Sequence, residues 1–381
     1  MNFEFDEEHR ILRDAVREFA EKEIRPYGKE YDEKGEYPWD IFRKAAKLGY
    51  VGADIPEEYG GSEMDYLGCA IIAEEFTRAD SSIGSAVLTA SLGCPMVRYF
   101  GTEEQKENYL PLVVKGKTPS AIAITEPDAG SDVQAIKTRA ERVEGGWKLN
   151  GTKTFITNGS ISDWVVVLAK TDMSAGYRGI SAFLVETDRD GYEARRIKKM
   201  GLNCHDTAEI YLKDLFVPEN NLIGNENFGF YQLMRFFNES RVFVGAVQLG
   251  MAVGAYERAL EYAKQRKAFG KPLIEHQAIQ FKLADMWKDI EAARLLVYRA
   301  AWMIDSGKAD PAFSSAAKLF ASETAVRVTY EALQIFGGYG YSKEYDIERY
   351  YRDARVGTIY EGTSEIQRLI IARMLSGKLR F

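Results

Sequence analysis

The chain has 381 residues, 46% hydrophobic and 28% charged, and no apolar run reaches the roughly 20 residues that a membrane-spanning helix needs. Its formal net charge of −7 argues against a nucleic-acid-binding protein, because such proteins normally carry a basic face. Three cysteines without a CxxC pair and three histidines predict neither a disulfide framework nor a metal site. The acidic start, residues 1–8, is the opposite of a targeting peptide, so we expect a cytoplasmic protein.

The first third of the chain has the hydrophobic pattern of helices. From about residue 6 the apolar positions recur at helical spacing, at Leu12, Ala15, Val16, Phe19 and Ala20. Similar segments continue to about residue 118. We therefore expect an all-helical N-terminal domain over residues 1–118.

The middle third changes to short runs rich in β-forming residues. These runs cover residues 120–125, 147–157, 164–169, 180–186 and 209–217. Turn signals separate them, such as Gly145-Gly146 and Asp190-Gly191. The pattern predicts an antiparallel β domain over residues 119–228.

Long helices return after Gly229 and predict a helical bundle over residues 229–381. Apolar residues keep a spacing of three and four over about seven turns, at Ile279, Leu283, Met286, Ile290, Ala293, Val297, Ala300 and Ile304. Asp310 before Pro311 is typical of a helix start, and Gly337-Gly338 is typical of a helix end.

Glu361 lies in a segment whose neighbours favour chemistry. Gly362 follows it directly, and a glycine there lets the backbone bend and pack close to a ligand. Ser364 with Gln367 three residues later has the spacing of a capping box, which predicts that the last helix begins there. From these residues alone, Glu361 is either a catalytic acid held at a helix start or a charge that compensates the helix dipole.

Two segments of the β domain have the residue types of a ligand site. Residues 125–132 run from a strand into a turn with hydroxyl groups and a glycine, whose amides can hold an anionic or heterocyclic ligand. Phe155 and Thr157 stand two residues apart, hence on one face of a strand, where a ring and a hydroxyl suit a flat cofactor. The alternatives are an ordinary proline turn and a half-buried strand.

Two segments of the bundle carry further signals. Residues 266–273 combine positive charge, an aromatic ring and a glycine between two helices, and residues 334–341 contain three glycines that permit close backbone approach. A solvated charge cluster explains the first segment equally well. A helix end explains two of the three glycines in the second.

Taken in this order, these segments resemble the acyl-CoA dehydrogenase family of flavoproteins over essentially the whole chain. The resemblance implies an α+β multidomain fold, with an N-terminal all-α domain, a middle antiparallel β domain and a C-terminal four-helix bundle. It also implies a homotetramer that binds FAD, with an acyl-CoA substrate and electron-transfer flavoprotein as partners. The family's reaction belongs to fatty-acid β-oxidation.

The resemblance implies specific contacts to the flavin end of FAD. Thr125, Gly130 and Ser131 would contact the flavin, with Ser131 also near the CoA arm. Thr157 would bond near the flavin N5, and Phe155 would stack on the ring where the family more often has tryptophan.

The resemblance also implies contacts from the bundle to FAD. The residues that would meet the adenine and pyrophosphate of a neighbouring subunit's FAD are Arg266, Phe269, Gln277, Gln334 and Gly338. Thr363 and Glu365 lie where the family again touches FAD, and Glu365 replaces a common glutamine.

Glu361 matches the family's base, which takes the α-proton of a thioester while a hydride leaves the β-carbon for the flavin N5. The rival positions carry no acid: Ser240 precedes Arg241, and residues 81–102 contain no Asp or Glu. Glu239 would point about 100° away from Ser240 on a helix. The residues expected to contact substrate are Ser91, Ser131, Asn238, Arg241, Tyr360 and Gly362.

The acyl preference is less defined by sequence. Residues 88–93 match part of the acyl pocket and are rich in small residues, which favours a short, branched or cyclic acyl chain. No arginine lies between Arg78 and Arg98 to clamp a dicarboxylic acyl group. The alternatives are an acyl-CoA oxidase or flavin monooxygenase on the same fold, which would pass electrons to oxygen, and a non-catalytic scaffold. For Arg241 the alternative is a surface ion pair.

Overall fold

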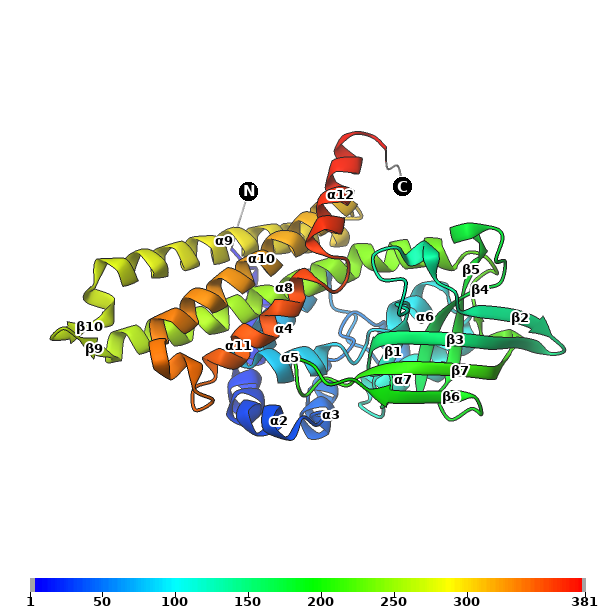
Figure 1. The fold of residues 1–381 in the computed structure, drawn as a ribbon, viewed down its shortest axis with the longest axis horizontal. Coiled ribbons are helices and arrows are strands. Elements are labelled where there is room, and N and C mark those ends of the chain that lie inside the picture. The colour runs from blue at the N-terminus through cyan, green and yellow to red at the C-terminus, as the bar shows by residue number, and fades with distance from the viewer. Residues whose placement is uncertain (1–3, 379–381) are drawn as a thin grey trace.

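The computed structural model describes residues 4–378, so the first three residues of the acidic start and the last three of the bundle lie outside the described residues. In chain order it has a helical part, a β sheet and a second helical part with long helices. Figure 1 shows the sheet at one end of an elongated molecule and the β9–β10 hairpin at the other. The expected fold class is confirmed.

The N-terminal part is helical, and its helix α4 contacts α1, α5, α8 and α9. The helices of this part are α1 (Glu7–Phe19), α2 (Gly28–Lys34), α3 (Trp39–Lys47), α4 (Tyr66–Ala79), α5 (Ser81–Leu88), α6 (Cys94–Phe100) and α7 (Glu103–Val114). Val16 and Phe19 of α1 are buried, as their spacing predicts. Helix α4 is buried over most of its length, including its charged residues Glu74, Glu75 and Arg78, and it packs against α1, α8 and α9, so it connects the first domain to the bundle.

The middle domain is one sheet in the order β6-β7-β3-β2-β4-β5-β8, with β1 paired to β4. Its strands are β1 (Ser120–Ala123), β2 (Arg139–Val143), β3 (Gly146–Thr157), β4 (Trp164–Lys170), β5 (Ile180–Glu186), β6 (Tyr192–Arg196), β7 (Thr207–Pro218) and β8 (Leu222–Ile223). Most pairs are antiparallel, as expected, but β1 and β2 run parallel to β4. Strand β4 is buried on both faces, which explains its continuous apolar run.

The C-terminal part is built on α8 (Gly229–Gln265), α9 (Gln277–Asp305), α10 (Pro311–Phe336) and α12 (Ser364–Leu375), with the short α11 (Ile347–Ala354) beside α10. The strands β9 (Lys267–Ala268) and β10 (Lys271–Pro272) form a hairpin between α8 and α9. The predicted seam of α9 is confirmed, since its positions from Leu283 to Ala300 are buried. The Asp310 carboxylate caps α10, and Gly337 ends it.

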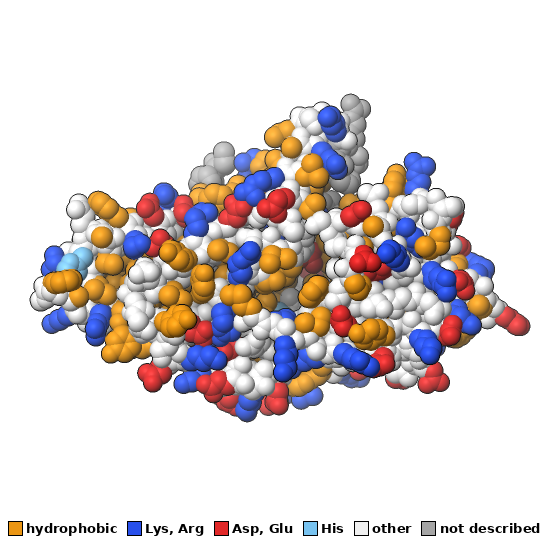
Figure 2. Space-filling view, viewed as in Figure 1, with side chains coloured by type: hydrophobic (Ala, Val, Ile, Leu, Met, Phe, Trp, Pro, Cys, Tyr) orange, Lys and Arg blue, Asp and Glu red, His pale blue; other side chains and the backbone are white. Residues whose placement is uncertain are grey.

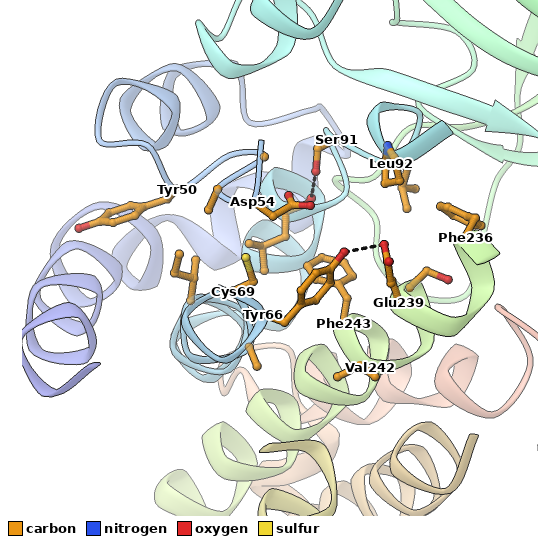
Figure 3. Close-up of a pocket in the computed structure, with 17 residues that line it drawn as sticks. Tyr50, Asp54, Tyr66, Cys69, Ser91, Leu92, Phe236, Glu239, Val242 and Phe243 are labelled. Atoms are coloured by element: carbon orange, nitrogen blue, oxygen red, sulfur yellow. Dashed lines mark hydrogen bonds between the residues drawn. The ribbon is translucent and has the colours of Figure 1, made fainter. Parts of the chain in front are cut away.

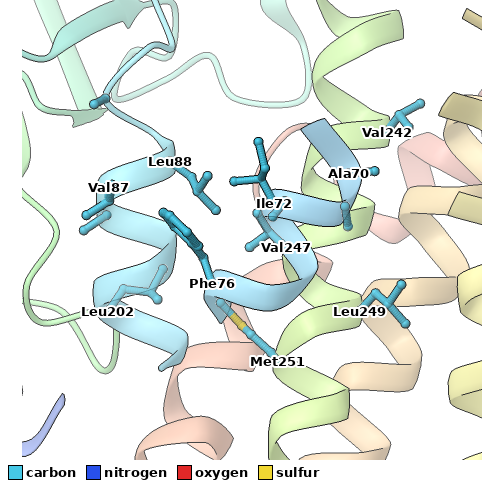
Figure 4. Close-up of a cluster of buried hydrophobic side chains, with 14 of the residues drawn as sticks. Ala70, Ile72, Phe76, Val87, Leu88, Leu202, Val242, Val247, Leu249 and Met251 are labelled. Carbon is cyan, nitrogen blue, oxygen red and sulfur yellow. The ribbon is translucent and has the colours of Figure 1, made fainter. Parts of the chain in front are cut away.

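One core joins the three parts. Figure 4 shows Phe76 of α4, Leu88 of α5 and Met251 of α8 close together, with Leu202 from the segment before β7 beside them. Close-packed side chains of this kind leave little freedom for one domain to shift against another. The site elements described below are therefore held in a fixed relation.

Candidate active site

The backbone at Glu361 turns sharply in front of α12. Glu361 and Gly362 both adopt left-handed conformations, with φ of 53° and 87°. That conformation costs a non-glycine residue about 1–2 kcal/mol, so neighbours must hold it. Gln367 Nε2 donates to the carbonyl oxygens of Glu361 and Gly362 at 2.9 Å, and Lys318 Nζ donates to the Gly362 oxygen at 2.8 Å.

The predicted capping box is wrong by one residue. The N-cap of α12 is Thr363, whose hydroxyl oxygen accepts a hydrogen bond from the Ile366 N–H at 3.3 Å, and Ser364 is the first helical residue. Gln367 cannot complete a box, because the N3 residue of a helix capped by Thr363 is Ile366, and the Gln367 side chain instead bonds the two carbonyls before the helix. The segment is held by hydrogen bonds, as the sequence pattern predicts, but these bonds are not those of a capping box.

The Glu361 carboxylate faces α8. Ser240 Oγ donates to Glu361 Oε2 at 2.8 Å. Burial raises the pKa of Glu361, while the Ser240 bond and the positive charges of Arg241 and Lys318 oppose that rise. The half-buried carboxylate is therefore a stronger base than an exposed glutamate and still has charges that stabilise its ionised form.

Two buried cations accompany this acid. Arg241 is only 6% exposed, with its guanidinium 5.1 Å from the centre of the Phe237 ring, so the surface-pair alternative is wrong. Burial lowers the pKa of Arg241 to about 10 and that of Lys318 to about 8, and the Glu361 charge limits both shifts. Buried cations are costly without a partner, and Glu361 supplies one.

A cavity of about 90 Å³ adjoins the acid between α4, α6 and α8 (Figure 3). Its wall includes Ser240, which also bonds Glu361, so cavity and carboxylate share a side chain. Ser91 lines it as expected, beside Leu88, Phe236 and Phe243. Of the other predicted substrate residues, Tyr360 accepts from Gln248 Nε2 at 3.1 Å, and Asn238 is half-buried on α8.

The two predicted ligand segments of the β domain lie together. The Thr154 N–H donates to the Thr125 oxygen at 2.9 Å, which ties the turn to β3. Beneath the turn the Lys153 ammonium, fully buried, pairs with the buried Glu126 carboxylate at 2.8 Å. Gly130 is exposed, with open space where a side chain would stand.

Strand β3 is irregular where the flat ligand is expected. Thr154 and Phe155 together face the single residue Glu209 of β7, a β-bulge, and Phe155 has a φ of 58°. The bulge interrupts the alternation of buried and exposed side chains along β3. Phe155 and Thr157 stand on either side of the buried Ile156 in the chain. Phe155 is 65% exposed. An exposed ring beside an open glycine turn fits a planar ring system such as a flavin.

The predicted contacts of the bundle form a second group far from this one. The Arg266 guanidinium lies 5.4 Å from the Tyr339 ring, which brings residues 266–277 against residues 334–341. Phe269 at the hairpin is 98% exposed. Arg266 is 26 residues beyond Ser240 along α8, or roughly 40 Å at the rise of an α-helix. Figure 1 shows this group at the tip opposite the sheet.

Sequence reasoning missed several residues that shape the site. They are Lys318, Gln248, Lys153 and the role of Ser240. Lys318 carried a usable signal, because it falls at a seam position of α10 between the small residues Ser314 and Ala321, where a charged side chain must be buried. The others are ordinary polar residues in their sequence context and give no such signal.

Comparison with known proteins identifies the arrangement. Family models described as the N-terminal, middle and C-terminal domains of acyl-CoA dehydrogenase match residues 6–117, 121–215 and 227–376. The chain belongs to the acyl-CoA dehydrogenase family. It is therefore an oxidoreductase, and FAD is its cofactor. The exposed Phe155 ring and the open turn at Gly130 fit the flavin of this cofactor.

Three relatives of this acyl-CoA dehydrogenase are informative. It is 44% identical to the 3-(aryl)acrylate reductase of Clostridium sporogenes over 97% of this chain and 99% of the relative. It is also 44% identical to the CarC subunit of the caffeyl-CoA reductase–Etf complex of Acetobacterium woodii, over 98% and 100%. The solved butyryl-CoA dehydrogenase of Megasphaera elsdenii is 40% identical, with a TM-score of 0.95 over 99% and 100%.

Two further features of this acyl-CoA dehydrogenase concern metals and membranes. Within residues 4–378, no three His, Cys, Asp or Glu side chains lie close enough together to hold a metal ion. In the same part of the chain no helix has the length and apolar character needed to cross a membrane. The roles of the individual site residues and the domain boundaries stay predictions.

Proposed function

We propose that the protein oxidises an acyl-CoA thioester to the 2-enoyl-CoA, with Glu361 as the base for the α-proton. The observation that carries this proposal is the position of Glu361, a half-buried carboxylate fixed by a strained backbone at a cavity and bonded to Ser240. FAD, when bound, accepts the hydride that leaves the β-carbon. The substrate thus loses one proton to Glu361 and one hydride, and a carbon–carbon double bond forms.

The surrounding residues would support this proton transfer. A desolvated carboxylate gains basicity, which suits a group that must take a weakly acidic proton near neutral pH. Arg241 and Lys318 limit that gain, because their positive charges favour the ionised form of Glu361. The Glu361 backbone N–H is the donor that we assign to the thioester oxygen, where negative charge develops.

The proposed electron acceptor is electron-transfer flavoprotein. Support comes from CarC, which is named as a subunit of a complex with such a protein. An acyl-CoA oxidase or a flavin monooxygenase on the same fold is the alternative, because both would pass electrons to oxygen instead. Reoxidation of the reduced protein by electron-transfer flavoprotein, but only slowly by air, would favour the dehydrogenase. The cytoplasmic location stays a prediction.

The proposed acyl group is short, branched or cyclic. Residues 88–93 are rich in small residues, and the cavity beside them is about 90 Å³. The cavity wall includes the aromatic rings of Tyr50, Tyr66 and Phe236, which suit a planar or cyclic group. The relatives named as aryl-acrylate and caffeyl-CoA reductases support a ring at this place.

The test is Glu361→Gln, which keeps the shape of the side chain and removes the base. We expect the variant to bind FAD and acyl-CoA and to reduce its flavin at least about 100-fold more slowly than the wild type in anaerobic stopped-flow experiments. The matched control is Glu344→Gln, an exposed acid in the same domain, which should reduce its flavin at the wild-type rate. Reduction of the Glu361 variant within a few-fold of the wild type would assign the base elsewhere.

A further inference from the structure

The wall of the acyl cavity contains a polar pair that proton transfer does not use. Tyr66 on α4 donates its hydroxyl hydrogen to Glu239 Oε2 on α8 at 2.5 Å, across the space shown in Figure 3. The Tyr99 hydroxyl lies 3.1 Å from that of Tyr66. Burial raises the pKa of Glu239 and that of Tyr99, the latter to about 12. Polar groups in such a place cost free energy unless they have hydrogen-bond partners.

The charges around this pair determine what it can bind. Asp54 also lines the cavity, and its carboxylate accepts from Arg98 at 2.5 Å. The Arg235 guanidinium stacks 4.0 Å from the centre of the Tyr99 ring, behind the cavity wall. Two carboxylates thus face the cavity and the cations stand outside it. A negatively charged acyl end is disfavoured there, whereas a hydrogen-bond donor is favoured.

We infer that the acyl group of the substrate carries a ring hydroxyl, which is bound by Glu239 and Tyr66. The hydroxyl would insert between the two side chains, donating to the Glu239 carboxylate and accepting the hydrogen that Tyr66 otherwise donates to Glu239, so that both polar groups stay paired after water leaves the cavity. A plain hydrocarbon ring would give the pair no new partner and would remove its water. The inference rests on the proposed function, because it assigns the substrate of that same cavity.

The experiment compares two thioesters that differ only in the hydroxyl, 3-phenylpropionyl-CoA and 3-(4-hydroxyphenyl)propionyl-CoA. Anaerobic stopped-flow titration of the FAD-loaded protein gives the dissociation constant and the limiting rate of flavin reduction for each. We expect the wild type to bind the hydroxylated thioester about 10-fold more tightly, the scale of one hydrogen bond to a charged group. The limiting rates should differ much less, since the hydroxyl acts in binding.

Two variants and one control assign this preference to the pair. In Glu239→Gln and in Tyr66→Phe the ratio of the two dissociation constants should fall toward one. Glu104→Gln, an exposed acid on α7, should keep the wild-type ratio. The ratio is measured within each variant, so a general loss of stability or of FAD does not produce the expected result.

The outcomes separate this inference from the proposed function. Equal binding of both thioesters by the wild type, or a ratio that both variants leave unchanged, would overturn the hydroxyl site and leave the dehydrogenase proposal standing. Failure of these two thioesters and of butyryl-CoA to reduce the wild-type flavin would overturn the proposed function itself. Tighter binding of the unsubstituted ring would also overturn the inference, because it would show that the pair repels the hydroxyl.

Discussion

At the scale of single residues, Glu361 is balanced between burial and two cations. Burial raises its pKa, and the Ser240 bond, Arg241 and Lys318 lower it. Only the ionised carboxylate can take a proton, so flavin reduction should increase as the pH rises through this pKa. The pH at which the rate increases therefore depends on the charges around Glu361.

Lys318→Met tests this balance. The variant removes one positive charge near Glu361 and the bond from Nζ to the Gly362 oxygen. With less charge to stabilise the carboxylate, the pKa of Glu361 rises, so the ascending limb of the rate profile should move to higher pH. Stopped-flow reduction from pH 5 to 9 measures the shift. Lys343→Met, at an exposed position, is the control, and an unmoved limb in the Lys318 variant would show that its charge does not act on Glu361.

The sequence predicted Glu361 as the catalytic acid but not the side chains that bond its segment. Glu361 could be found because an acid directly before a glycine, in a segment that matches a known family, is a local signal. Ser240 and Lys318 bond Glu361 and Gly362 from positions 121 and 44 residues earlier in the chain, and sequence spacing does not reveal such contacts. The misplaced cap has a different, local cause, because the Gln367 side chain bonds the carbonyls of Glu361 and Gly362, six and five residues earlier, instead of the N-cap.

At the scale of elements, the Lys153–Glu126 pair joins strand β3 to the turn at residues 125–131. Lys153 Nζ also donates to the Ile124 oxygen at 3.0 Å, and the Glu126 carboxylate accepts from the N–H groups of Lys137 and Thr138. Burial lowers the pKa of Lys153 to about 8, which Glu126 partly offsets. The pair thus holds in place the turn that we expect to contact the flavin.

Lys153→Met should loosen this turn. It leaves the buried Glu126 carboxylate without its cation, a change that typically costs 3–5 kcal/mol. We expect a lower unfolding temperature and weaker FAD binding, measured by calorimetry and by titration of the apoprotein. The double variant Lys153→Met/Glu126→Gln should lose less stability than the two single losses added together. Strict additivity would mean that the two side chains do not interact.

The strands that the sequence predicted are those with apolar runs. Strands β4 and β5 agree with the expected runs to within one residue, because their side chains are buried along the whole length. The sequences of β2 and β6 were not predicted, since RAERV and YEARR are mostly exposed and carry charges that strand propensity disfavours. The parallel pairing of β1 and β2 with β4 depends on chain reversals that no local turn signal encodes.

At the scale of the whole molecule, one chain cannot bring all its predicted FAD contacts to one FAD. Ser240, which bonds Glu361, lies roughly 40 Å from Arg266 along α8. The sheet that carries Phe155 and the hairpin that carries Phe269 lie at opposite ends of the molecule (Figure 1). Hydrophobic side chains also reach the surface of the helical part (Figure 2). On α9 the exposed ones are Phe281, Trp287, Leu295 and Trp302, which fall within about one third of the helix circumference. Both features favour the proposed homotetramer, in which the tip of one subunit meets the FAD of another.

Arg266→Ala tests this assembly through the cofactor. A guanidinium that bonds the pyrophosphate of a neighbour's FAD contributes about 1.5–3 kcal/mol, so FAD binding should weaken roughly 10- to 100-fold. Because the same contact joins two subunits, the oligomer should dissociate at higher protein concentration than the wild type, and added FAD should restore it. Sedimentation velocity without and with added FAD measures the dissociation of the oligomer and its restoration. Lys271→Ala removes a neighbouring charge of the same hairpin and should leave assembly and FAD affinity unchanged. If the Arg266 variant bound FAD as tightly as the wild type, the hairpin would serve subunit packing alone, and the cofactor would be held within one chain.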